Sequence, residues 1–223
     1  MKSNCKKSCD AVGGDGAENS NDNDKGPGGK DSGQGGRGGQ EGGDKNHGGK
    51  DKGPEDNNRG GNEGGGGDGT LSEEDKKKML NKHNEYRRNV DPPASNMKDM
   101  VWNKTCEKYA KQLAETCNFH HDSNEDRPGQ GQCIYAYGAR IENVEQPVDS
   151  WYDEVKDFDY NSNKCNPGKV CGHYTQVVWA DTTQLGCAKV NCPTMQNGMD
   201  GGDFVVCNYN PPGNWADQKP YET

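Results

Sequence analysis

The most restrictive feature of this 223-residue sequence is the position of its aromatic side chains. All sixteen Phe, Trp and Tyr residues lie from position 71 onward, whereas residues 1–70 have none and hold 23 of the 33 glycines. A segment without aromatic side chains and almost without branched aliphatic ones cannot bury enough apolar surface to offset its ordering entropy. We therefore expect a disordered, low-complexity tail rich in Gly, Asp and Lys over residues 1–70, and one folded domain over residues 71–223.

Both parts of the chain are mildly acidic, and this excludes two classes of partner. Residues 1–70 carry 10 basic and 13 acidic side chains, and the remainder carries 17 and 23. Neither part has a basic patch suited to nucleic acid or a Lys/Arg run suited to an anionic membrane surface. No stretch is long and apolar enough to cross a bilayer. We expect no nucleic-acid partner and no membrane span.

The second part of the chain contains eight cysteines, at positions 106, 117, 133, 165, 171, 187, 192 and 207. An even number at this density is typical of a disulfide framework formed in an oxidising compartment. Zinc knuckles are a weaker interpretation, because no pair of C-x-x-C motifs is present. The sequon Asn103-Lys104-Thr105 agrees with secretion. The first residues, MKSNCKKSCDAVGG, lack the apolar core of a signal peptide, so we interpret the chain as a fragment, a mature form or one with a wrong start.

Apolar periodicity predicts three helices in the folded part. Ser72 is suited to cap the first of them, with Asp75 three residues further on in a capping-box arrangement. Pro147 is suited to the start of the third. The predicted helices cover residues 72–88, 103–117 and 147–158.

Strands are predicted mainly in the last third of the chain. Alternating apolar residues and turn signals predict strands over residues 173–179, 185–191 and 203–209, and residues 134–141 fit a short strand or a turn. Helices followed by sequential strands are typical of an α+β fold, in which helices cover an antiparallel sheet.

Several separate segments resemble the CAP superfamily of cysteine-rich secretory proteins, antigen 5 venom allergens and plant pathogenesis-related proteins. They are CGHYTQVVWADTTQLGCAKVNC (171–192), FVVCNYNPPGNW (204–215), HNEYRR (83–88) and WYDEVKDFDYNSNKC (151–165). The likeness covers about residues 71–221 and is greatest to plant-type and invertebrate single-domain members. It implies a three-layer α-β-α sandwich with a central antiparallel sheet, secretion, and the binding of sterols or other lipids known for several members.

The resemblance also implies disulfide pairs, which the sequence alone leaves open among about a hundred pairings. It pairs Cys165 with Cys171, Cys187 with Cys207 and Cys117 with Cys192. Cys106 and Cys133 then remain as a fourth pair.

The resemblance further implies a cleft site. The histidine of Gly-His-Tyr-Thr-Gln is His173, and the glutamate that closes Trp-Tyr-x-Glu is Glu154. CNFHHD offers His120 and His121 for the second cleft histidine, and the spacing favours His121. The fourth family residue is the glutamate of Cys-Gly-Glu-Asn, and here Tyr135 stands in its place.

Two imidazoles and one carboxylate form a sufficient zinc set with one open position, which could activate water. A hydrolase also needs a general base beside that water, and tyrosine, with an ordinary pKa of about 10, is a poor base at neutral pH. We therefore expect weak Zn²⁺ binding by His121, Glu154 and His173, with no catalytic residue and no required cofactor. The alternative for each histidine is a buried imidazole hydrogen-bonded to the backbone.

The sequence leaves three functions open. The first is a secreted protein with a defence-related or venom-allergen-like role, which binds a sterol, another lipid or an extracellular protein partner without turnover. The second is a metal-dependent hydrolase that uses the same histidines and glutamate. The third is a precursor from which the C-terminal peptide PPGNWADQKPY (211–221) is released as a signal.

Overall fold

The computed structural model describes residues 5–10, 69–196 and 200–223. The chain divides into two compact units, of which one comprises Met1–Asp15 with Gly65–Thr223 and the other is Gly16–Gly64. The second unit lies outside the described residues, as does most of the tail that we expect to be disordered. The expectation of disorder does not hold for Cys5–Asp10, which form strand β1 and pair with strand β3. Composition averaged over 70 residues hides a six-residue strand whose backbone groups bond to an existing sheet edge.

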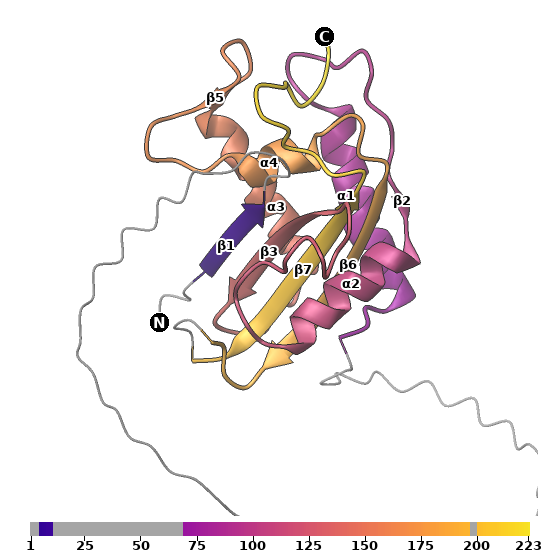
Figure 1. Ribbon diagram of the computed structural model, residues 1–223, viewed down its shortest axis with the longest axis vertical. Coiled ribbons are helices and arrows are strands. Elements are labelled where there is room, and N and C mark those ends of the chain that lie inside the picture. Colours follow the sequence, from indigo (N-terminus) through magenta and orange to yellow (C-terminus); the bar gives the residue numbers. More distant parts are fainter. Residues whose placement is uncertain (1–4, 11–68, 197–199) are drawn as a thin grey trace, which may run out of the picture. The chain divides into compact units, whose positions relative to one another are not determined.

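A five-stranded sheet with the order β1-β3-β7-β6-β2 forms the centre of the first unit, Met1–Asp15 with Gly65–Thr223 (Figure 1). The sheet strands are β1 (Cys5–Asp10), β2 (Val101–Trp102), β3 (Gly131–Tyr137), β6 (Gln184–Cys192) and β7 (Gly202–Asn210). Three neighbouring pairs run antiparallel, but β2 runs parallel to β6, so the sheet is mixed where we expected it to be antiparallel. The strands predicted over 185–191 and 203–209 are confirmed, and the ambiguous stretch contains the end of β3.

Alternate side chains of the strands enter two separate cores, one on each face of the sheet. On one face Ile134 and Phe204 pack with Leu113 of helix α2 (Lys104–Glu115), which lies across β6 and β7 in Figure 1. On the other face Tyr135 and Val205 belong to a larger core. That core also contains side chains of α1 (Glu73–Arg88), α3 (Gln146–Tyr152) and α4 (Gly172–Val177). The α+β class and the three-layer α-β-α sandwich are thus confirmed.

Local side chains start the first two helices where the sequence predicts them. The hydroxyl of Ser72 accepts from the backbone N–H of Asp75 at 3.1 Å, and the Asn103 side chain accepts from two amides at the start of α2. Both contacts satisfy N–H groups that a helix start leaves without a partner. Gly186 of β6 allows α2 to approach the sheet, because a Cβ there would lie 2.1 Å from the backbone nitrogen of Glu107.

The third predicted helix is divided into shorter elements. Helix α3 ends at Tyr152 and is followed by a 3₁₀ turn, Asp153–Asp157. A two-stranded hairpin then follows, made of β4 (Phe158–Asp159) and β5 (Lys164–Cys165). Residues 166–171 connect this hairpin to α4.

The strand predicted over 173–179 is wrong, because this stretch forms α4. Its amino end is satisfied by Glu154, whose Oε2 accepts from the N–H groups of His173 and Tyr174 at 3.1 and 3.2 Å. At its carboxyl end Arg87 donates to the carbonyl of Val177 at 3.0 Å. The β-branched and aromatic residues of this stretch favour a strand, but tertiary contacts at both ends stabilise a six-residue helix.

Three of the four expected disulfides are confirmed, namely Cys117–Cys192, Cys165–Cys171 and Cys187–Cys207. The expected Cys106–Cys133 bond does not form, because the two residues belong to opposite faces of the sheet. Cys106 lies on α2, whereas Cys133 faces the core that contains α1, α3 and α4. In the described part of the chain Cys106 is a free, buried thiol, and burial raises its pKa to about 12. It is therefore protonated and unreactive at neutral pH.

Candidate functional site

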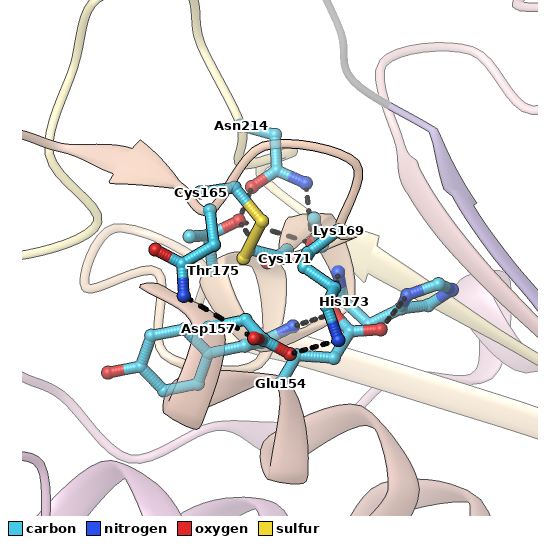
Figure 2. The surroundings of a disulfide bond; sticks show 11 residues. Glu154, Asp157, Cys165, Lys169, Cys171, His173, Thr175 and Asn214 are labelled. Atoms are coloured by element: carbon cyan, nitrogen blue, oxygen red, sulfur yellow. Dashed lines mark hydrogen bonds and ion pairs between the residues drawn. A yellow bond between two sulfur atoms is a disulfide. The ribbon is translucent and has the colours of Figure 1, made fainter. Parts of the chain in front are cut away.

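A buried pair of side chains, Glu154 and His173, lies between the 3₁₀ turn and α4. Glu154 is 4% exposed and His173 is 0% exposed. The Nδ1 atom of His173 lies 2.8 Å from Oε1 of Glu154 (Figure 2). The disulfide between Cys165 and Cys171 fixes the chain two residues before His173, so the pair is held on a cross-linked segment.

The hydrogen bond to Glu154 determines the tautomer of neutral His173. Because Nδ1–H donates to the carboxylate, the ring lone pair is on Nε2. Within the part of the chain that the structure describes, His173 Nε2 is buried and has no hydrogen-bond partner. An imidazole oriented through Nδ1 by a carboxylate, with Nε2 as its acceptor atom, is the arrangement found in metal-binding histidines.

Both carboxylate oxygens of Glu154 accept hydrogen bonds from the segment that carries His173. Its Oε1 accepts from the ring of His173, and its Oε2 accepts from the backbone N–H groups of His173 and Tyr174. The structure thus places Glu154 beside His173, as the resemblance implies, and the role of either residue as a zinc ligand stays a prediction.

His121 lies with a different set of residues. Its Nδ1 is 3.0 Å from Oε1 of Gln132, an oxygen that also accepts from the backbone N–H of Asp122 at 3.1 Å. Gln132 lies two residues before Ile134 on β3, so both side chains are on the face of the sheet that packs against α2. Among residues 69–196 and 200–223, no three or more His, Cys, Asp or Glu side chains form a group that could hold a metal ion. The structure brings Glu154 and His173 together without His121, and zinc binding stays a prediction.

Tyr135, which we expect in place of a family glutamate, belongs to the core on the same face of the sheet as Trp151, whose ring stacks on His173. Its hydroxyl accepts from Nε2 of Gln146 at 2.9 Å. Its ring meets Trp151 edge-on at 6.5 Å, and Trp151 lies parallel to the His173 ring at 6.0 Å between centroids. Aromatic rings therefore line this part of the site.

These contacts agree with the comparison to known sequences. The profile of the cysteine-rich secretory protein family, CAP, matches residues 80–209, more than half of the chain. The chain belongs to the CAP family. The resemblance identified from the sequence motifs is thus confirmed.

Relatives of this CAP chain include proteins named as peptidase inhibitors and as cysteine-rich secretory proteins. Peptidase inhibitor 16 of Mus musculus is 37% identical over 153 residues, which cover 68% of this chain and 30% of that protein. Cysteine-rich secretory protein 3 of Homo sapiens is 40% identical over 151 residues, covering 66% of this chain and 60% of that protein. The chain spans about a third of the length of the peptidase inhibitor 16 proteins and LCCL-domain proteins that it matches.

Solved structures show the same CAP fold. The crystal structure of Na-ASP-1 is 27% identical with a TM-score of 0.58, over 69% of this chain and 42% of that one. The crystal structure of NaASP2 with Zn²⁺ is 29% identical with a TM-score of 0.56, over 69% of this chain and 87% of that one. No helix in the described part of this chain is long and apolar enough to cross a membrane.

The motif HNEYRR of this CAP chain contributes three buried residues, His83, Asn84 and Arg87. The Nδ1–H of His83 donates to the Met79 carbonyl at 2.7 Å, and its Nε2 accepts from the Tyr209 hydroxyl at 3.0 Å. Burial, together with the charge of Arg87, lowers the pKa of His83 to about 4. Sequence analysis missed Arg87, although its place one helical turn after His83 was a signal that both share a buried face.

Proposed function

We propose that this CAP protein is secreted and acts by binding a ligand without turnover. The main observation behind the proposal is that both carboxylate oxygens of Glu154 accept hydrogen bonds from His173 and Tyr174. The family resemblance implies that Tyr135 stands in place of the other cleft carboxylate. Neither residue is suited to be a general base, which metal-assisted hydrolysis needs. Three disulfides and relatives that are named as secretory proteins support an extracellular location.

A sterol or another lipid is the first ligand class to test, and an extracellular protein partner is the second. The chain should be secreted from a eukaryotic host, and its organic extract should be analysed by mass spectrometry. We expect a lipid at a near-stoichiometric ratio, and saturable binding of labelled cholesterol. We also expect no hydrolysis of ester or peptide substrates with zinc present, above the background of His173→Ala. Hydrolysis that is lost in both His173→Ala and Glu154→Gln would contradict binding without turnover.

The alternative of a released C-terminal peptide has less support from the packing of that segment. The carbonyl of Pro220 accepts from the backbone N–H of Ala180 at 2.7 Å, and that of Tyr221 accepts from the Tyr160 hydroxyl at 2.7 Å. The Tyr221 side chain is buried in the core that contains α1, α3 and α4. Residues 211–221 therefore contribute to the fold, and their release would expose part of this core.

A weak zinc site is a second candidate, favoured by the buried Nε2 of His173. Zinc would be held through Nε2 of His173, whose ring Glu154 orients through Nδ1, and His121 would join it only by leaving its contact with Gln132. Bound zinc would supply a Lewis acid at this point. The NaASP2 structure was determined with Zn²⁺, which makes the same ion a reasonable choice here.

Calorimetric zinc titration tests this site. We expect His173→Ala to weaken zinc binding at least tenfold, and Glu154→Gln to weaken it by about tenfold through loss of ring orientation. Tyr135→Glu is expected to tighten binding, because it restores a carboxylate facing the His173 layer. Equal binding by His173→Ala and the wild type would place the zinc elsewhere. Equal binding by His121→Ala would remove His121 from the ligand set.

A further inference from the structure

A pocket of about 270 Å³ opens beside the Cys165–Cys171 disulfide, outside the Glu154–His173 pair. Three segments line it, namely the β4–β5 hairpin, α4 with the residues that follow it, and the segment 214–218. Figure 2 shows the disulfide close to Thr175 and Asn214, which form part of the lining. We propose that this pocket binds a neutral oligosaccharide, with Trp215 as its stacking surface. The proposal goes beyond the lipid or partner binding proposed above and does not depend on it.

The lining has no charged side chain. It combines three aromatic residues with a hydroxyl, three amides, a glycine and the disulfide: Phe158, Trp179, Trp215, Thr175, Asn163, Asn214, Gln218, Gly172 and Cys165–Cys171. Without a Lys, Arg, Asp or Glu, the pocket offers nothing to neutralise a phosphate, a carboxylate or a cation. A neutral sugar suits both halves of the lining, because its C–H face packs on an aromatic ring and its hydroxyls bond to amides.

The exposure of Trp215 is not explained by packing in the core. Its side chain is 40% exposed, although a tryptophan side chain is usually largely buried. The Gln218 backbone N–H donates to the Trp215 carbonyl at 3.2 Å, so the indole and the Gln218 amide are presented by one turn. An aromatic face and an adjacent amide on one rigid turn form a surface on which a sugar ring can rest.

Hydrogen bonds tie the three segments together around the pocket. The Thr175 hydroxyl donates to Oδ1 of Asn214 at 2.7 Å, and Nδ2 of Asn214 donates to the Gly172 carbonyl at 2.9 Å. Nδ2 of Asn163 donates to the Gln218 carbonyl at 3.0 Å. Asn163 and Asn214 both have left-handed backbones, with φ of 53° and 59°. A pocket held this way is largely pre-formed, so binding orders few groups.

A neighbouring hollow extends the proposed site beyond one sugar ring. This second pocket has a volume of about 480 Å³ and shares Trp179 and Gln218 with the first. It also contains the ring of Tyr160, over which the Lys219 ammonium lies at 4.3 Å. Its lining also includes the charged residues Asp181, Lys219 and Glu222, so the uncharged first pocket is the proposed sugar site and the second lies where further rings of an oligosaccharide would extend.

Titration of the full chain with cellohexaose, mannohexaose and chitohexaose tests the proposal. Tryptophan fluorescence and calorimetry are the measurements, and a heparin hexasaccharide serves as the anionic comparison. We expect at least one neutral hexasaccharide to bind with a Kd of about 1 mM or tighter, and more tightly than the heparin fragment does. Trp215→Ala should weaken binding at least tenfold, Gln218→Ala several-fold, and Trp215→Phe only slightly.

Val101→Ala is the matched control, because Val101 is 59% exposed on β2 and lines neither pocket. It should bind the same sugar as the wild type does. Absence of binding to all three neutral hexasaccharides at about 5 mM would overturn the proposal. So would unchanged binding by a folded Trp215→Ala, or preference for the heparin fragment. Vesicles of phosphatidylcholine form a separate arm: binding to vesicles alone, lost in Trp215→Ala, would assign the indole to a lipid surface and reject the sugar site.

Discussion

Arg87→Ala is expected to lower the free energy of unfolding by about 4 kcal/mol or more, since several buried carbonyls would lose their donors at once. Arg87 is 0% exposed and emerges from α1. Its guanidinium donates to five backbone carbonyls, those of Lys98, Val177, Trp179, Ala180 and Thr182. Burial lowers the pKa of Arg87 to about 10, which still leaves the side chain charged at neutral pH.

Urea unfolding followed by circular dichroism measures this effect. Arg87→Lys should fall between alanine and the wild type, because one ammonium cannot reach all the carbonyls that a planar guanidinium reaches. Arg88→Ala is the matched control on the same helix, since the Arg88 side chain is exposed and pairs with the exposed Asp99. Its unfolding midpoint should remain close to that of the wild type. A stability of Arg87→Ala within about 1 kcal/mol of the wild type would show that these carbonyls do not depend on Arg87.

The helices differ in whether the residues that satisfy their ends are close to them in the sequence, and this decided which of them could be predicted. The helices at 72–88 and 103–117 were predictable because their caps, Ser72 and Asn103, lie next to them in the sequence. Helix α4 was not predictable, because its two ends are satisfied by Glu154 and by Arg87, which lies 90 residues from Val177. Local composition favours a strand there, and only the tertiary contacts reverse that preference.

The disulfides and the candidate site could likewise be predicted only in part, because the rest depends on three-dimensional contacts. Family resemblance gave three disulfides, but the Cys106–Cys133 pair required knowing which face of the sheet each residue occupies. The motifs correctly joined Glu154 to His173. They did not reveal that Glu154 orients the ring, because this depends on which atoms its two oxygens contact. They also grouped His121 with the pair, whereas His121 contacts Gln132.

The stability of the folded domain is expected to fall between pH 6.5 and pH 4 because of His83. Its pKa is about 4 in the folded protein, whereas an unfolded histidine titrates near 6.5. Between these values the unfolded chain binds more protons, so stability rises with pH in this window and is lost as pH falls through it. The difference corresponds to roughly 3 kcal/mol between pH 7 and pH 4. The physical cause is the burial of His83, to which the nearby charge of Arg87 adds.

Two variants distinguish the contribution of His83 to the pH dependence of stability from that of the carboxyl groups, which also titrate in acid. We expect His83→Gln to be less stable than the wild type at pH 7, because the Met79 and Tyr209 hydrogen bonds are disturbed. Its stability should nevertheless change less between pH 6.5 and pH 4, so the two curves should converge in acid. His120→Gln, which alters an exposed imidazole, should keep the wild-type slope. Urea midpoints at half-unit pH intervals give these curves, and parallel curves for His83→Gln and the wild type would mean that His83 is not the group responsible.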